Sequence, residues 1–230
     1  MKTRIVVDST ADILPEYLDQ IHTVPLTVSF GEEEYIDGVT MDHRTFYQKL
    51  IETDAMPSTS QASPAAFAEQ YDQAAADDEE VVVITISSKL SGTYQSAMIA
   101  AAGCSSVYVV DSENASVGCG ILVGLALRYL RDGMTASAIA EKLQEDKKKI
   151  VVIAVLDTLE YLKRGGRISK AAAFAGGLLN IKPVISIADG EIQLLGKARG
   201  SKMGNNLLAQ QIQKVGGIDF TKPVLLGFTG

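Results

Sequence analysis

Three short runs of apolar, mostly β-branched residues, each followed at once by polar residues, constrain the fold of this chain more than any other feature. The runs cover residues 5–7, 81–86 and 107–110, and the polar segments after them are Asp8-Ser9-Thr10, residues 87–93 and Asp111-Ser112. Continuous runs of this kind are typical of strands covered on both faces. A helix-compatible segment, residues 94–102, lies between the second and third runs, and two more, residues 120–130 and 136–148, follow the third. Strands that alternate with helices predict a largely parallel α/β sheet.

The sign of the charge changes near residue 150, which indicates a domain boundary. Residues 1–150 hold 23 acidic and 11 basic residues, a net charge of −12, whereas residues 151–230 hold 5 acidic and 10 basic residues, a net charge of +5. A positive region on an acidic protein favours a local anionic ligand or an acidic partner. An uneven but solvated surface would give the same count.

The second half predicts antiparallel pairing as well. A strand is expected over residues 150–156, and a β-hairpin around Asp189-Gly190, because Asp-Gly supplies the positive φ angles of a tight turn. A helix over 201–215 and a last strand over 223–228 follow. We therefore predict an α/β protein of two α/β domains. Residues 1–149 form a mainly parallel sheet flanked by helices, and residues 150–230 form a mixed sheet that we expect to be C-terminally truncated, since no helix follows its last strand.

Composition excludes several classes of protein. A hydrophobic content of 47% and a charged content of 21% are typical of soluble globular domains. Two cysteines, Cys104 and Cys119, cannot form a disulfide framework and favour a reducing, cytoplasmic compartment. The N-terminus offers no apolar run for a signal peptide or a membrane span, so stable membrane insertion is not expected. A net charge of −7 argues against nucleic-acid binding. His22 and His43 lack metal-ligand spacing, so we predict neither a metal nor a cofactor.

Three turns rich in Ser and Thr are candidates for binding an anion. They cover residues 8–10, 58–64 and 87–93. Hydroxyls and free backbone N–H groups at a helix N-terminus suit a carboxylate or a phosphate. In open α/β sheets, ligands bind beyond the carboxyl ends of the strands. The alternative is that these residues only cap helices.

The segment Lys163-Arg164-Gly165-Gly166-Arg167 is the sharpest single feature of the basic half. Two adjacent glycines permit backbone angles that hold the flanking guanidinium groups in fixed directions. Arginine binds carboxylate or phosphate through two parallel hydrogen bonds. A solvated glycine turn beside ordinary surface charge is the competing interpretation.

Taken together, these segments resemble the DegV family over nearly the whole chain. The segments that carry the resemblance are Asp8-Ser9-Thr10, Thr59-Ser60-Gln61 with Ser63-Pro64, residues 91–97, residues 159–168 and Lys182-Pro183. Each segment is weak alone, but the order and spacing of the set are specific. The resemblance implies a two-domain α/β protein that binds a long-chain fatty acid. Some members of the family are the FakB subunit of bacterial fatty acid kinase, whose separate ATP-dependent partner FakA phosphorylates the bound acid to an acyl phosphate.

The resemblance also implies roles for individual residues. It places the hydroxyls that bind the carboxylate on Thr59 and Ser91. The residues that complete this carboxylate site are Ser60, Gly92 and Thr93. The basic residues for phosphoryl transfer or for contact with the kinase fall on Arg167 and Arg199. A histidine that the family carries in a Gly-Pro-Gly-containing segment has no counterpart in this sequence.

The acyl chain requires an apolar tunnel. Burial contributes about 0.8 kcal/mol per methylene, so a long chain outweighs the head-group contacts. The expected lining residues are Phe174, Leu178, Leu179, Ile181 and Ile187. The same residues would serve equally well as ordinary core.

Two functions of different classes therefore remain open. The first is a lipid-binding protein without catalytic activity of its own, which presents a fatty acid to a FakA-like kinase or acts in regulation without one. The second is an enzyme that acts on a small carboxylated or phosphorylated metabolite through the same turns. That enzyme would use Arg167 as an electrophilic clamp and Asp8 as its general base. The length and saturation of the acyl chain and the oligomeric state stay open.

Overall fold

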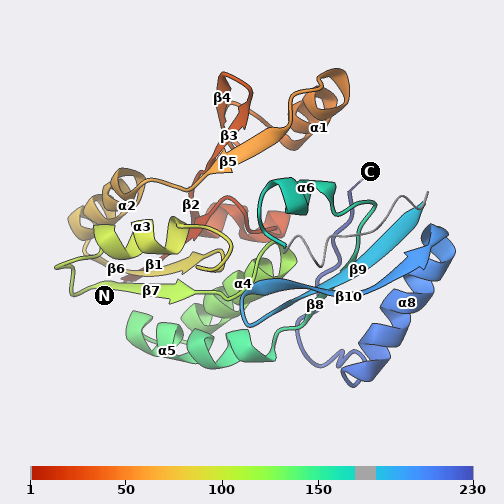
Figure 1. Ribbon diagram of the computed structural model, residues 1–230. Helices are drawn as coiled ribbons and strands as arrows, with labels where there is room; N and C mark the ends of the chain where they lie inside the picture. Colours follow the sequence, from red (N-terminus) through yellow and green to blue (C-terminus); the bar gives the residue numbers. More distant parts are fainter. Residues whose placement is uncertain (1, 169–179, 230) are drawn as a thin grey trace.

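A four-stranded parallel sheet forms the centre of the N-terminal half in the computed structural model, which describes residues 2–168 and 180–229 (Figure 1). Its strands are β1 (Lys2–Asp8), β2 (His22–Val24), β6 (Glu79–Thr85) and β7 (Val107–Asp111). Their order is β2-β1-β6-β7, and every pair is parallel. The predicted parallel sheet is confirmed.

Helices cover both faces of this sheet, which explains why its strands are apolar throughout. The helices are α2 (Pro64–Ala76) and α3 (Thr93–Ala100) on one face, and α4 (Val117–Arg131) and α5 (Ala136–Asp146) on the other, with short 3₁₀ turns at η1 (Pro15–Gln20) and η2 (Lys147–Lys149). Val6 and Val83 pack toward α2 and α3, whereas Ile5 and Ile84 pack toward α4 and α5. Because successive side chains of a strand point to opposite faces, both sets must be apolar.

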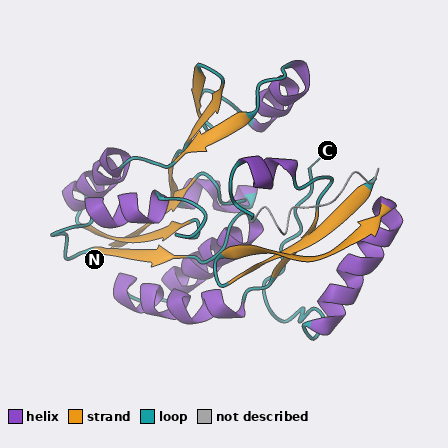
Figure 2. Cartoon of the chain, in the orientation of Figure 1, coloured by secondary structure: helices purple, strands orange, loops and turns teal. Residues whose placement is uncertain are grey.

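A small antiparallel sheet, which the sequence did not predict, projects from the body (Figures 1 and 2). It contains β3 (Thr27–Phe30), β4 (Glu33–Ile36) and β5 (Pro57–Ser60), with α1 (His43–Glu52) beside it. We call residues 27–60 the arm. Val28, Phe30 and Met41 form its own buried core. The interpretation of residues 58–64 as a turn is wrong for residues 58–60, because β5 pairs with the distant strand β3.

The C-terminal half contains a second sheet, in the order β10-β9-β8. Its strands are β8 (Val152–Val155), β9 (Ile181–Ala188) and β10 (Glu191–Arg199). Asp189 and Gly190 have φ angles of +51° and +78°, so the predicted hairpin is confirmed. A two-residue turn joins only antiparallel strands. All described pairs of this sheet are antiparallel. The predicted mixed sheet would also contain a parallel pair, and none occurs among the described strands of this sheet.

Two helices flank the second sheet. The helix α8 (Gly200–Lys214), which confirms the prediction over 201–215, packs closely enough that a side chain on Gly204 would contact Lys182 and Val155. The short helix α6 (Glu160–Arg164) lies on the apolar side formed around Ile185.

The prediction of a strand over 223–228 is wrong. No described strand pairs with this segment, and a strand needs a neighbour for its backbone groups.

Candidate functional site

Loop 87–93 lies at the carboxyl end of β6 and is tightly held by its own hydrogen bonds. The backbone N–H groups of Leu90 and Ser91 donate to the carbonyl of Ser87 at 3.0 and 3.1 Å. The Oγ of Ser91 and the Oγ1 of Thr93 share a hydrogen bond of 2.9 Å. Thr93 is fully buried, whereas Ser91 is half-buried. The loop therefore presents the Ser91 hydroxyl at the edge of the sheet where ligands of parallel α/β proteins bind.

Two of the segments singled out in the sequence contact this loop. The Nε of Arg167 donates to the Leu90 carbonyl at 3.0 Å. The carboxamide of Gln61 lies directly against Gly92, and its Nε2 donates to the Oγ of Ser96 at 2.9 Å. Gln61 and Arg167, which lie about 30 and 77 positions from the loop along the chain, thus both contact it.

The remaining predicted hydroxyls lie on the arm. Thr59 is opposite Val28 and Ser60 is opposite Thr27, in the pairing of β5 with β3. Both side chains are exposed, and they precede Gln61 directly. The structure therefore brings the end of β5 to loop 87–93 through Gln61.

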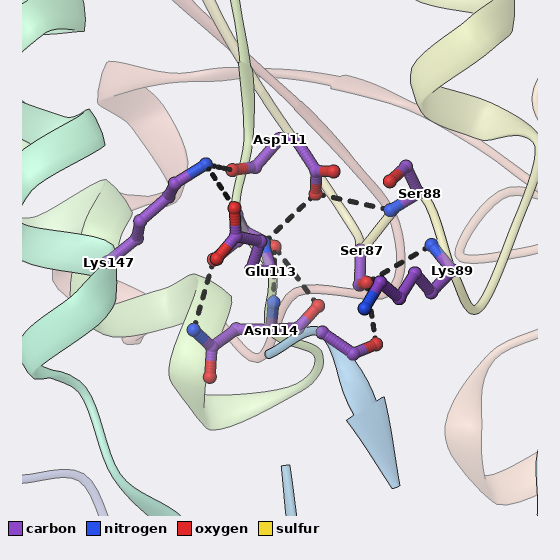
Figure 3. Close-up of polar contacts among 9 residues, drawn as sticks. Ser87, Ser88, Lys89, Asp111, Glu113, Asn114 and Lys147 are labelled. Atoms are coloured by element: carbon purple, nitrogen blue, oxygen red, sulfur yellow. Dashed lines mark hydrogen bonds and ion pairs between the residues drawn. The ribbon is translucent and has the colours of Figure 1, made fainter. Parts of the chain in front are cut away.

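A partly buried polar network supports loop 87–93 (Figure 3). The Oδ1 of Asp111 accepts hydrogen bonds from the backbone N–H groups of Ser88 at 3.1 Å and Glu113 at 2.9 Å. The ammonium group of Lys147 donates to the Asp111 carbonyl at 3.0 Å and pairs with the Glu113 carboxylate at 2.8 Å. The Lys147 side chain is only 7% exposed, whereas the Glu113 side chain is 37% exposed, so this ion pair lies at the boundary between the interior and solvent.

The same loop is attached to the second sheet. The Oγ of Ser87 donates to the carbonyl of Gly190 at 2.7 Å, and Lys89 lies 3.7 Å from the carboxylate of Glu191. Sequence reasoning missed Asp111, Lys147 and Gly190 as supporting residues. A signal for Asp111 was available, because it directly follows a predicted strand. Lys147 is the first of three consecutive lysines, and only its burial in the structure distinguishes it from the other two.

Asp8, the general base of the alternative enzyme, has a structural position. Its Oδ1 accepts from the N–H of Thr10 at 3.0 Å and from the Thr10 hydroxyl at 2.6 Å, while its Oδ2 accepts from the N–H of Ile86 at 2.6 Å. Burial raises the pKa of the Asp8 carboxyl, although these hydrogen bonds oppose the shift. Oδ2 joins the end of β1 to the residue after β6, and Oδ1 holds the turn at Thr10, so both oxygens are already engaged, which is a poor arrangement for taking a proton from a substrate.

The raised pKa of Asp8 predicts a specific pH dependence of stability. The folded state holds the Asp8 proton more tightly than the unfolded state, in which the pKa is about 4. The contribution of Asp8 to the free energy of unfolding is therefore complete at low pH and decreases as the pH rises from about 4 through the raised pKa. In Asp8→Asn this decrease should be absent. Urea unfolding of both proteins across the acidic range measures the difference, and two parallel pH profiles would contradict it.

An apolar surface of the second sheet leads toward the same loop. Strand alternation places Ile181 and Ile187 on the same side of β9 as Ile185, which packs with Ile192 and Leu194. A cavity of about 640 Å³ lies between this side, loop 87–93 and the Gly-Gly-Arg turn. Its lining is mixed, with the apolar side chains of Leu90, Ile168, Ile192 and Leu194 beside the polar ones of Lys89, Arg167, Glu191 and Gln193. Phe174, Leu178 and Leu179 lie outside the described residues.

Arg199 stands apart from loop 87–93. It is exposed at the end of β10, opposite Ile181 in the ladder and directly before α8. Within residues 2–168 and 180–229, no three His, Cys, Asp or Glu side chains are grouped closely enough to hold a metal ion. None of the helices in these ranges is long and apolar enough to cross a membrane.

Comparison with known proteins places this arrangement in a family. Residues 2–225 match the family model described as "Uncharacterised protein, DegV family". The chain belongs to the DegV family. A DegV domain-containing protein of Caldanaerobacter subterraneus subsp. tengcongensis is 38% identical over 226 residues, which is 96% of this chain and 80% of that protein. The resemblance inferred from the sequence motifs is thereby confirmed.

Two solved structures share the fold of this chain, one of a DegV protein described as binding a fatty acid and one of a protein loaded with linoleic acid. A fatty-acid-binding DegV protein from Thermus thermophilus superimposes with a TM-score of 0.83 at 37% identity, covering 93% of this chain and 78% of the other. The fatty acid kinase B3 protein of Streptococcus pneumoniae, loaded with linoleic acid, gives a TM-score of 0.82 at 25% identity, covering 94% and 79%. This chain is therefore a structural neighbour of DegV proteins that bind fatty acids.

Proposed function

We propose that this protein binds a long-chain fatty acid, with the carboxylate at loop 87–93 and the acyl chain along the apolar side of the second sheet. The observation that supports this most is the meeting of three segments, around Gln61, Ser91 and Arg167, beside a cavity whose lining includes Ile168, Ile192 and Leu194. Related DegV structures hold fatty acids. The hydroxyls of Thr59 and Ser91 would donate to the carboxylate, with Ser60, Gly92 and Thr93 shaping the site.

The ligand would lie between two domains, residues 1–149 and residues 150–230. The separate hydrophobic cores support this division, since the cores of the parallel sheet contain residues up to Ile150 and the core around Ile185 contains only residues from Ala154 onward. The contacts of Ser87 with Gly190 and of Arg167 with Leu90 cross the boundary at the proposed carboxylate site. A ligand bound there would contact both domains.

The chemistry of the site suits binding and presentation rather than catalysis. Neutral hydroxyl donors orient a carboxylate without enclosing it in a tight ion pair, so one of its oxygens stays available to an incoming phosphoryl group. Buried methylenes supply most of the affinity, at about 0.8 kcal/mol each. Arg167, and Arg199 at the end of β10, would face an ATP-dependent kinase partner, which would form the acyl phosphate. The protein itself would act in the cytoplasm as a lipid-binding protein with no metal or cofactor.

Native mass spectrometry of the purified chain, followed by denaturing extraction, tests the proposal. We expect an excess mass that extracts as one long-chain fatty acid per chain, and saturable rebinding of that acid after lipid removal. Extraction of a small polar carboxylate or phosphate would support the alternative enzyme instead. A delipidated chain that fails to rebind any long-chain fatty acid would overturn the proposal.

A further inference from the structure

Gln61 connects the strand that carries Thr59 to the loop that carries Ser91. It lies between β5 and α2, and its side chain reaches across to the start of α3. The Nε2 of Gln61 donates to the Oγ of Ser96 at 2.9 Å. Ser96 is fully buried, and a buried hydroxyl needs a hydrogen-bond partner, which Gln61 supplies. This hydrogen bond joins residues 35 positions apart in the chain.

The packing of Gln61 explains why residue 92 is a glycine. A Cβ on Gly92 would lie 1.9 Å from the Oε1 of Gln61, which is far inside van der Waals contact. The backbone of Gly92 has φ −74° and ψ 3°, angles that residues with side chains also adopt. The requirement for glycine therefore comes from the Gln61 carboxamide and not from the backbone conformation.

The arm joins the body at the end where β5 leaves it, with Leu26 and Ala62 on either side buried in the core of the body. The arm's own core of Val28, Phe30 and Met41 is separate from the cores of the body. At this same end, the Oγ of Ser9 donates to Asp37 at 2.7 Å and accepts from the N–H of Leu26 at 3.0 Å. Thr59 is two residues from Gln61, a distance of about 7 Å along an extended chain. Among these attachments, the Gln61 contact is the one that joins the end of β5 to Gly92 and α3, so it bears directly on how far the Thr59 hydroxyl lies from the Ser91 hydroxyl.

We propose that Gln61 is a positioning residue for the ligand carboxylate. Its hydrogen bond to Ser96 and its packing on Gly92 fix the spacing of the two hydroxyls that receive the carboxylate. Gln61 acts through Thr59 and Ser91 and needs no contact with the ligand. This inference rests on the proposed fatty-acid function and adds to it the residue on which the geometry of the head-group site depends.

A double-mutant cycle tests the proposal in the full chain. In Gly92→Ala the new methyl group displaces the carboxamide, which is the mobile end of a long side chain, and leaves the buried Ser96 hydroxyl without this partner, so the unfolding midpoint should fall modestly and by about as much as in Gln61→Ala. The Kd for palmitic acid should rise about tenfold, and Gln61→Ala should produce the same rise. The double variant should bind no more weakly than either single variant, because both changes remove one interaction. Additive losses, about a hundredfold in total, would overturn the proposal.

Two controls separate positioning from general damage. Hexadecanol has the same tail without the carboxylate, and its affinity should be unchanged in both variants, whereas a loosened fold would weaken both ligands alike. Gln73→Ala removes an exposed glutamine of α2 and should leave both Kd values unchanged. If the parent chain binds palmitic acid and Thr59→Ala weakens it while Gln61→Ala does not, the positioning role fails and the proposed function stands. If the parent chain does not bind palmitic acid at all, both fail.

Discussion

Replacing Thr59 and Ser91 together with alanine should weaken the binding of a long-chain fatty acid by about a hundredfold. Each hydroxyl would donate one hydrogen bond to an ionised carboxylate, and such a bond contributes about 1.5 kcal/mol or more, which is roughly tenfold in Kd. Neither side chain belongs to a buried apolar core, so the unfolding midpoint should change little. Titration of the delipidated protein with a fluorescent fatty acid measures the effect, and the amount of co-purified lipid gives an independent check.

Ser58→Ala is the matched control for this experiment. Ser58 lies on β5 beside Thr59, is equally exposed, and points to the opposite side of the strand. It should bind fatty acid as the parent does. The affinity for the corresponding alcohol should fall far less in the double variant than the affinity for the acid, because the tail contacts remain. If the double variant retained the acid as well as the parent, the carboxylate would have to lie elsewhere.

The parts of the fold that depend on local sequence could be predicted, and the parts that depend on distant partners could not. Runs such as residues 81–86 identify buried strands because both faces must be apolar, and Asp189-Gly190 identifies a hairpin because of its backbone angles. The strand β5 has the sequence Pro-Ser-Thr-Ser, which lacks any alternation of apolar and polar residues. Only its pairing with β3, about 30 residues earlier, makes it a strand. Such pairing leaves little trace in a single sequence.

The candidate site shows the same division. The Ser/Thr turns and the Gly-Gly-Arg segment could be recognised from their residue types, because those types suit anions. Their assembly could not be predicted, because it uses a backbone carbonyl at Leu90 and the bare Cα of Gly92, neither of which is marked by a side chain. The supporting role of Lys147 depends on its burial, which two neighbouring lysines conceal in the sequence.

Arg167→Ala should slow the formation of acyl phosphate by an ATP-dependent kinase partner about a thousandfold, while the Kd for the fatty acid changes only a few-fold. An arginine that stabilises the charge on a transferring phosphoryl group typically contributes 10³-fold or more to the rate. Arg167 is suited to this because its contacts with the carbonyls of Leu90 and Gly165 hold the guanidinium beside the loop of Ser91. Those contacts use two of its five N–H donors. The other donors can meet an anion.

Arg164→Ala provides the comparison that decides what Arg167 does. Arg164 is also exposed and lies three residues earlier, but it forms an ion pair within α6 with Glu160 at 2.6 Å. Its loss should leave both the rate and the Kd unchanged, since exposed pairs of this kind contribute little. The measurement is a single turnover with protein preloaded with fatty acid and kinase in excess. If the rate in Arg167→Ala fell only as much as its affinity for the fatty acid, Arg167 would act as a structural support for loop 87–93. If Arg167→Ala and Arg164→Ala gave equal rates, Arg167 would have no role in phosphoryl transfer.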